Sequence, residues 1–341
     1  MIAFAPSRVG AVDREGRPYD RSDPEAYGTS VAKPEGHDAF WQETWDRLQR
    51  IPLEPQVEPV ALRSTDEVAV YEGHYTSWEG LRIACWYCVP RGPAAARAAP
   101  RDGRFPAIAF MPGYVSEPPL GTGKDWARAG FACVVAAPRG KLRSNAVFNP
   151  GYPGLLTHNL ADYQTYGYRG FYCDAWRAID FLLSRPEVDP DRIGVTGSSQ
   201  GGGLSIVTAA WRREVRAACP GAPYLCGMRD AINLTHTYPY EEINDYLRTY
   251  PERRDQALRT LDFYDAINMA PRITCATLVN VGLVDPVCPP ETGYAVYRAI
   301  GAAVKDLHAY PGEGHSAGAA QHAPHVRAWM RRHLGVAGVG D

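Results

Sequence analysis

The chain has 341 residues, of which 45% are hydrophobic, and its formal net charge is −2 at pH 7. This length allows one large domain with a substantial core, or two smaller domains. The balanced charge and the lack of a long basic run argue against nucleic acid as a partner. No stretch approaches the roughly 20 apolar residues of a membrane span, so no membrane partner is expected either.

The N-terminus and the eight cysteines bear on location. The first residues lack a charged start followed by a long apolar core, so no secretory signal is predicted. Most cysteines lie in apolar runs, which is typical of buried free thiols. Cys85 and Cys88 form a C-x-x-C inside a strand-like run, where residues three apart point to opposite faces. Shared metal ligation is therefore not predicted there, and a cytoplasmic location is expected.

The first third of the chain is predicted to hold an arm, a helix and two strands. Residues 1–35 are rich in Pro, Gly and charged residues, which indicates an extended arm on the domain or on a neighbouring subunit. Strands are expected near 67–75 and 80–89, followed by a loop over 91–104. Large apolar side chains at helical spacing predict an amphipathic helix over 37–50: Phe40, Trp41, Trp45 and Leu48.

From residue 106 onward strands alternate with helices. This alternation predicts an α/β domain, residues 36–341, with a mostly parallel sheet covered by helices on both faces. The expected strands are 106–111, 131–137, 192–196, 215–219, 273–284 and 304–310; the expected helices are 124–129, 171–184, 202–211 and 323–334.

Residues 222–270 interrupt the alternation with polar and aromatic segments of helical pattern. This length between two strands exceeds one crossover helix. We therefore expect a helical cap over the carboxyl edge of the sheet, above a site. An appendage that only packs against the domain is the alternative.

The segment 197–201 reads G-x-S-x-G, with Ser199 at its centre, between a strand-like run and a helix-like run. Strand, sharp turn and helix form the context in which this motif becomes a nucleophile elbow. The turn is tight, so small residues are needed two positions before and after the serine, and Gly197 and Gly201 meet that demand. Ser198 lies one residue off the nucleophile position.

Two later strand ends carry the groups that a serine nucleophile needs. Asp285 follows the strand within 273–284, and His315 follows the strand 304–310 in a Gly-rich turn. The order Ser199, Asp285, His315 is the order found in α/β-hydrolases, whose functional groups gather at carboxyl strand ends. Taken alone, Asp285 fits an ordinary turn and His315 fits a surface histidine. Together they predict a catalytic triad.

An oxyanion hole needs two backbone N–H donors. One is expected from Gln200, the residue after the nucleophile, and the other from the loop after the strand 106–111. Pro112 in that loop has no N–H, so Tyr114 is the predicted second donor. An aromatic lining of the pocket is the alternative role for Tyr114.

These motifs resemble the acetyl xylan esterase and cephalosporin C deacetylase family, carbohydrate esterase family seven, over about residues 35–335. The G-L-x-D-x-x-C-P-P match at 282–290 is the most specific part. The other matching segments are G-x-S-Q-G-G at 197–202, Y-G-Y-R-G at 166–170 with Asp174 and Arg177, which resembles the family's Y-Y-R segment, F-W at 40–41, and the cap segment 236–243. The chain departs from the family at Lys141, where glutamine is usual, at Ser316, where glutamate is usual, and at Met111-Pro112, where histidine is usual.

The resemblance implies a serine esterase that removes small acyl groups, chiefly acetyl, from sugars or related alcohols. It implies a homo-oligomer, a hexamer in the family, and no metal or organic cofactor. Tyr114, Tyr238, Pro239 and Tyr240 are expected to line a narrow acyl pocket, with cap packing as the alternative role. Two rival functions stay open: a hydrolase of another ester, lactone or amide, motivated by Lys141 and Ser316, and a non-catalytic binding protein on the same fold.

Overall fold

The computed structural model describes residues 12, 19 and 22–336, except 99, 115–119 and 152–153. Its strands form one sheet of nine strands: β1 (Gln56–Pro59), β2 (Val68–Thr76), β3 (Arg82–Pro90), β4 (Phe105–Met111), β5 (Ala132–Ala137), β6 (Val188–Ser198), β7 (Val215–Gly221), β8 (Ala276–Gly282) and β9 (Lys305–Tyr310). The helices are α1 (His37–Gln49), α2 (Gly92–Arg97), α3 (Leu120–Arg128), α4 (Tyr168–Leu183), α5 (Gln200–Trp211), α6 (Met228–Leu234), α7 (Glu241–Thr249), α8 (Arg254–Tyr264), α9 (Ala266–Met269), α10 (Pro290–Ala299) and α11 (Ala319–His333).

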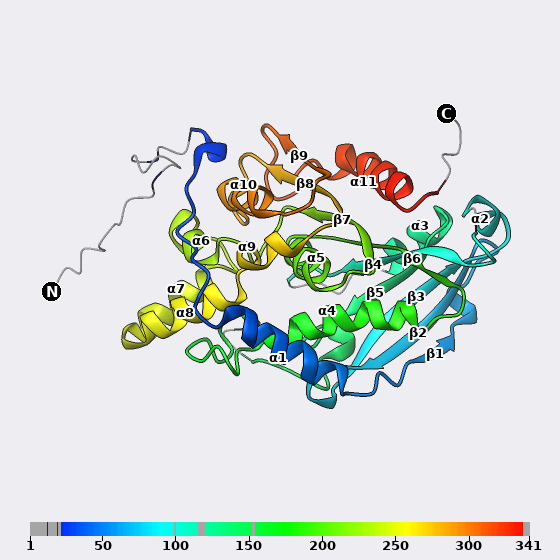
Figure 1. The fold of residues 1–341 in the computed structure, drawn as a ribbon, viewed down its shortest axis with the longest axis horizontal. Coiled ribbons are helices and arrows are strands. Elements are labelled where there is room, and N and C mark those ends of the chain that lie inside the picture. The colour runs from blue at the N-terminus through cyan, green and yellow to red at the C-terminus, as the bar shows by residue number, and fades with distance from the viewer. Residues whose placement is uncertain are drawn as a thin grey trace.

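The strand order is β1-β2-β3-β5-β4-β6-β7-β8-β9. Neighbouring strands are antiparallel in the part of the sheet ordered β1-β2-β3-β5. They are parallel in the part ordered β5-β4-β6-β7-β8-β9. Each of the parallel strands needs a crossover, and most of these crossovers are helices, which gives the predicted α/β fold. In Figure 1 the sheet runs through the middle of the molecule, with α4 on one side and α11 on the other.

Two apolar clusters lie on the two faces of the sheet. The larger one joins the sheet to α1, α4 and α5, and the smaller one joins it to α3 and α11. Cys85 belongs to the first cluster and Cys88 to the second, so the predicted opposite orientation of these two thiols is correct. β5 is buried along its whole length, as expected of a strand covered on both faces.

The sheet has its topological switch point at β4. The chain adds β5 on one side of β4 and then returns to add β6 on the other side. Met111 pairs with Gly197, so the carboxyl ends of β4 and β6 lie level with each other. Ligands of open α/β sheets bind in the crevice outside such a switch point.

One local prediction was wrong, and one short strand was missed. The expected loop over 91–104 contains α2, because Pro93 stands in its first turn and a run of alanines follows. The short edge strand β1 was not predicted at all. Its residues are mostly exposed and include Pro59, so they lack an apolar alternation.

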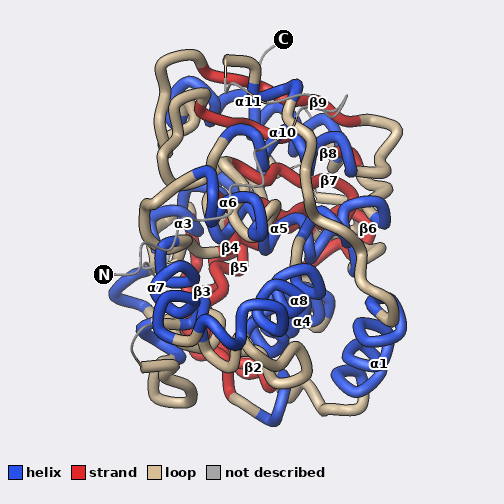
Figure 2. The backbone as a smooth tube through the Cα atoms, turned by 90° about the vertical axis from the view of Figure 1, so that its left-hand side faces the viewer, coloured by secondary structure: helices blue, strands red, loops and turns tan. Residues whose placement is uncertain are grey.

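The segment 222–270 leaves the sheet after β7 and forms α6, α7, α8 and α9 before the chain enters β8. α6, α7 and α8 gather at one end of the molecule, at the left in Figure 1 and toward the viewer in Figure 2. Asp265, which is fully buried, fixes the start of α6 by accepting hydrogen bonds from the amides of Gly227 and Met228 at 3.0 and 2.7 Å.

The described part of the N-terminal arm packs on its own domain. The Asp230 carboxylate of α6 accepts hydrogen bonds from the Thr29 hydroxyl at 2.6 Å and from the Ser30 amide at 3.1 Å. Arg298 of α10 donates to the carbonyl of Tyr27 at 2.6 Å. Residues 1–11, 13–18 and 20–21 of the predicted arm lie outside the described residues. Within the described chain, no helix is both long and apolar enough to cross a bilayer.

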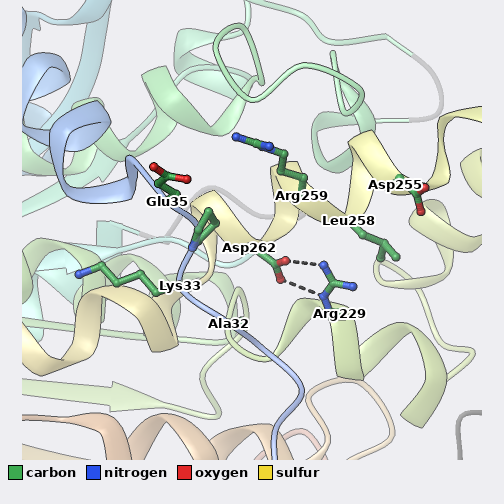
Figure 3. A pocket seen from close by; sticks show the side chains of 9 residues that line it. Ala32, Lys33, Glu35, Arg229, Asp255, Leu258, Arg259 and Asp262 are labelled. Carbon is green, nitrogen blue, oxygen red and sulfur yellow. Dashed lines mark hydrogen bonds and ion pairs between the residues drawn. The ribbon is translucent and has the colours of Figure 1, made fainter.

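Between the arm and α8 lies a hollow of about 400 Å³ (Figure 3). Arg229 of α6 and Asp262 of α8 form an ion pair in its wall, with the Arg229 Nε 3.0 Å from a carboxylate oxygen. The other lining side chains come from the arm residues 32–35 and from α8. None of the predicted site residues lines this hollow.

Candidate active site

Ser199 occupies a strained turn between β6 and α5. Its φ of 60° and ψ of −122° lie where an L-residue persists only if its surroundings enforce the conformation. The Ser199 amide donates to the carbonyl of Gly221 at 2.9 Å, and its carbonyl accepts from the amide of Tyr224 at 3.0 Å. The end of β7 therefore holds the elbow in place from both sides of the serine.

The glycines around Ser199 are required by close backbone contacts. A Cβ at Gly197 or Gly201 would lie 2.6 or 2.3 Å from the carbonyl oxygen of Met111, far inside van der Waals contact. A Cβ at Gly203 would lie 2.1 Å from the carbonyl oxygen of Tyr224. The glycine pattern of the motif thus lets α5 start directly against the ends of β4 and β7.

Asp285 and His315 meet at the carboxyl ends of β8 and β9. His315 Nδ1 lies 2.9 Å from Asp285 Oδ2, and with Nδ1 protonated the imidazole donates to the carboxylate. The other carboxylate oxygen, Oδ1, accepts from the amides of Val287 and Cys288 at 2.8 and 3.0 Å. The Asp285 side chain is 1% exposed and that of His315 is 35% exposed. The carboxylate is therefore fixed and buried, while the imidazole reaches the surface of the site.

Cys288 lies beside this pair. Burial raises the pKa of the Cys288 thiol well above its ordinary value, and the Ser199 side chain acts on that thiol in the opposite direction. Donor atoms of Asp285, Cys288 and His315 all lie within 4.8 Å of one another. Asp285 and His315 thus lie beside a buried thiol that also interacts with Ser199. Sequence reasoning assigned no role to Cys288, although it lies inside the G-L-x-D-x-x-C-P-P match.

The same three donor groups form a geometric candidate for a metal ion, the one such group within the described residues. Both Asp285 oxygens already accept hydrogen bonds, from His315 and from two backbone amides. A neutral thiol is also a poor ligand, because metals bind the thiolate. This donor set fits a proton-transfer pair better than a resident metal. The expected lack of a metal stays a prediction.

Gln200 is the first residue of α5, so its backbone N–H has no partner within the helix. The Gln200 side chain is fully buried, and its Nε2 donates to the hydroxyl of Tyr168 at 2.8 Å. The predicted oxyanion donor is the backbone N–H, not this side chain. The helix N-terminus at this point favours negative charge.

Tyr114 follows β4, the strand beside β6, and its side chain reaches α7 in the segment 222–270. The Tyr114 hydroxyl lies 2.7 and 2.9 Å from the two carboxylate oxygens of Glu242 on α7. Burial raises the pKa of Glu242 to about 7. The backbone of the same turn binds the ammonium of Lys141, which comes from the loop after β5.

Besides Tyr114, three residues of the segment 236–243 are predicted to line an acyl pocket, and they differ in exposure. Tyr238 is 59% exposed, and its hydroxyl donates to Asp245 on α7 at 2.5 Å. Tyr240 is fully buried and packs with its ring centroid 4.3 Å from that of Tyr224. Pro239 between them is buried. Ser316, next to His315, is exposed and its hydroxyl donates to Glu313. The acyl-pocket role of Tyr238, Pro239 and Tyr240 stays a prediction.

The nine-stranded sheet, the elbow and the paired carboxylate and imidazole at the following strand ends define an α/β hydrolase. Within this class the chain belongs to the acetyl xylan esterase (AXE1) family, whose model matches residues 23–333. The resemblance derived from the motifs is therefore confirmed.

Known proteins of this kind are similar over most of the chain. The acetyl xylan esterase from Paenibacillus sp. R4 is 30% identical, with a TM-score of 0.82 over 93% of this chain and 99% of its own. Acetyl xylan esterase 1 from Thermoanaerobacterium sp. JW/SL YS485 is 28% identical, with a TM-score of 0.81 over 92% and 98%. Acetyl esterase Axe7A from Xylanibacter ruminicola is 28% identical over 300 residues, which are 83% of this chain and only 64% of that protein.

Proposed function

We propose that the protein is a serine esterase that hydrolyses acetyl esters of sugars or related alcohols. The observation that carries this proposal is the Asp285–His315 hydrogen bond at the same sheet edge as the strained Ser199 turn, in a chain of the acetyl xylan esterase family. The names of the similar enzymes support acetyl as the acyl group. The proposed partner is a small acylated substrate, and neither nucleic acid nor a membrane is proposed as a partner.

The proposed chemistry follows from the positions of these groups. His315 accepts the proton of the Ser199 hydroxyl as the oxygen attacks the ester carbonyl, and Asp285 stabilises the resulting imidazolium. The backbone N–H groups of Gln200 and Tyr114 receive the developing oxyanion. His315 then returns the proton to the leaving alcohol. A water molecule hydrolyses the acetyl-enzyme by the same steps in reverse.

Hydrolysis of a substrate panel, measured as the acid released, tests this function. The panel holds acetylated xylo-oligosaccharides, acetylated monosaccharides, cephalosporin C, longer acyl esters of the same alcohols, a lactone and a peptide amide. We expect kcat/KM to be highest for acetyl esters and to fall with acyl length. Faster cleavage of the amide, or of a lactone, would favour the alternative hydrolase function. Failure of a fluorophosphonate to label Ser199 in folded protein would favour a non-catalytic binding protein.

The proposal has three further parts. The protein acts on cephalosporin C, it is located in the cytoplasm, and it forms a homo-oligomer, which is a hexamer in the family. The eight cysteines are all free and buried thiols, which suits a reducing compartment. Light scattering of the purified protein measures the oligomer directly. A mass near the 37.5 kDa of one chain would contradict the hexamer.

A further inference from the structure

Lys141 is a buried lysine in the turn after β5. It is 4% exposed, and burial lowers the pKa of its ammonium to about 7. Among the described residues, no carboxylate forms an ion pair with it. Desolvating an ammonium without a counter-charge is unfavourable, so the buried Lys141 ammonium needs polar groups that accept hydrogen bonds from it.

Two backbone carbonyls are those partners. The Lys141 Nζ lies 2.5 Å from the carbonyl oxygen of Gly113 and also donates to the carbonyl oxygen of Tyr114. Both carbonyls belong to the turn after β4, the turn that carries the predicted second oxyanion donor. Lys141 therefore ties the loop after β5 to the loop after β4.

The backbone beneath Lys141 is itself fixed. The Ser144 amide donates to the Lys141 carbonyl at 2.8 Å, and the Ser144 hydroxyl accepts from the Ala84 amide at 3.0 Å. The same hydroxyl donates to the carbonyl of Ala137, the last residue of β5. Lys141 thus projects from a turn that is anchored to β3 and β5. Because its backbone is held, the ammonium can hold the two carbonyls that it binds.

Peptide geometry passes this restraint to the Tyr114 N–H. The Gly113–Tyr114 bond is not among the cis bonds of the described chain, so its C=O and N–H point in opposite directions. An ammonium on the Gly113 carbonyl leaves the Tyr114 N–H on the other side of the peptide plane. The charge also polarises the peptide, which makes the N–H a stronger donor.

The Tyr114 side chain is held independently. Its hydroxyl donates to Glu242, as described above, and accepts from the amide of Leu156 at 3.4 Å. The side chain therefore fixes where Tyr114 lies, but it does not set the rotation of the peptide that precedes it. Only the carbonyl contacts of Lys141 do that among the contacts of the described residues.

We propose that Lys141 is a positioning residue of the oxyanion hole: it binds the Gly113 and Tyr114 carbonyls and thereby aims the Tyr114 N–H at the ester oxygen. This inference rests on the proposed function. An N–H that stabilises the transition state contributes to kcat much more than to substrate binding. Loss of Lys141 therefore lowers kcat and changes KM little.

The experiment compares Lys141→Met with Lys141→Gln on one acetyl ester, with kcat, KM and the unfolding temperature measured for each. Met keeps the length of the side chain but removes the donors, whereas Gln keeps two N–H donors and is the residue usual in the family. We expect Lys141→Met to lose about 10- to 100-fold in kcat with KM within about twofold, since a missing oxyanion donor costs about 10²–10³-fold. We expect Lys141→Gln to retain at least about a third of the wild-type kcat.

Lys305→Met is the matched control. The Lys305 Nζ also binds backbone carbonyls, those of Tyr297, Arg298 and Ile300 at 3.0, 3.2 and 2.6 Å, but it does so at the end of α10, away from Ser199. We expect this variant to unfold at a lower temperature and to keep its kcat. Equal kcat losses in Lys305→Met and Lys141→Met would overturn the inference, because both would then reflect stability alone.

Two other results also overturn it: a Lys141→Met enzyme with wild-type kcat, or a folded Lys141→Gln enzyme that loses more than tenfold. If Lys141→Met does not fold, Lys141→Gln decides by the same limits. Failure of the proposed function itself is distinguishable, because the wild-type protein would then release no acetate from any ester of the panel.

Discussion

The Tyr114 hydroxyl lies 2.7 Å from one Glu242 carboxylate oxygen and 2.9 Å from the other, which joins the turn after β4 to helix α7. Glu242 is 7% exposed, and burial raises its pKa to about 7. A carboxyl group with this pKa changes its charge near neutral pH, next to a predicted oxyanion donor. The predicted cap and the proposed site are therefore linked through an ionisable contact.

Glu242→Gln should make the protein more stable at alkaline pH than the wild type. The ordinary pKa of this carboxyl is 4.5, so the unfolded chain loses the proton near pH 4.5 while the folded chain keeps it up to about pH 7. The wild type thus has a stabilising contribution below pH 4.5 that is lost as pH rises through 7. The loss amounts to at most about 3 kcal/mol. Unfolding temperatures of both proteins at pH 5.5 and 8 measure it.

Glu241→Gln, one residue earlier on α7, is the control for this pH dependence. Burial acts to raise the Glu241 pKa, but hydrogen bonds from Asn244 and Arg248 outweigh it, and the net pKa is lowered. A lowered pKa contributes stability at high pH that is lost on acidification, so this variant should show the opposite trend. Lys141 is present in the wild type and in both variants, so its contribution to the pH dependence of stability cancels in the comparison. A stability difference for Glu242→Gln that stays constant with pH would contradict the raised pKa.

Asp285→Asn should leave the fold intact and remove most activity. The Asn oxygen can keep the hydrogen bonds from the amides of Val287 and Cys288. Its NH₂ group then faces His315 Nδ1, which forces the proton onto Nε2, the atom that must accept it from Ser199. We expect kcat to fall about 10³- to 10⁴-fold at unchanged unfolding temperature. An enzyme that keeps a tenth of its kcat would show that His315 does not depend on Asp285.

Individual residues show which parts of the site can be predicted from the sequence. Ser199, Asp285 and His315 could be placed together because strand ends can be recognised in the sequence and parallel strands bring those ends to one edge. Lys141 was recognised only as a departure from the family. Its contact with Gly113 joins loops 28 residues apart, and no local pattern encodes that approach. Glu242 and Cys288 were missed as partners for the same reason, and β1 was missed because an exposed edge strand needs no apolar pattern.

Ser199→Ala should abolish turnover without unfolding the protein. Alanine keeps the Cβ, so the backbone contacts with Gly221 and Tyr224 remain and only the hydroxyl is lost. Removal of the nucleophile in another serine hydrolase costs about 10⁶-fold in kcat, and a loss of that order is expected here. Fluorophosphonate labelling should vanish in parallel. Substantial residual acetate release would move the nucleophile to another residue; Ser198→Ala, which should stay active, separates the two neighbours.

Gly201→Ala should damage both the fold and the activity, although it adds one methyl group. That methyl would lie 2.3 Å from the Met111 carbonyl oxygen, which is backbone at the end of β4 and cannot rotate away. The change therefore pushes α5 from β4 and separates the Gln200 and Tyr114 amides. We expect kcat to fall more than tenfold and the protein to lose about 1–3 kcal/mol, as in other overpacked sites.

Gly121→Ala in α3 is the matched control for this substitution. A methyl group added at Gly121 would meet no atom of the described residues within 4 Å beyond its own helix turn and chain neighbours, and alanine favours helix, so we expect this variant to keep its kcat and its unfolding temperature. Wild-type kcat and unfolding temperature in both variants would show that the elbow has room for a methyl group. Its glycines would then not be required by the approach of Met111.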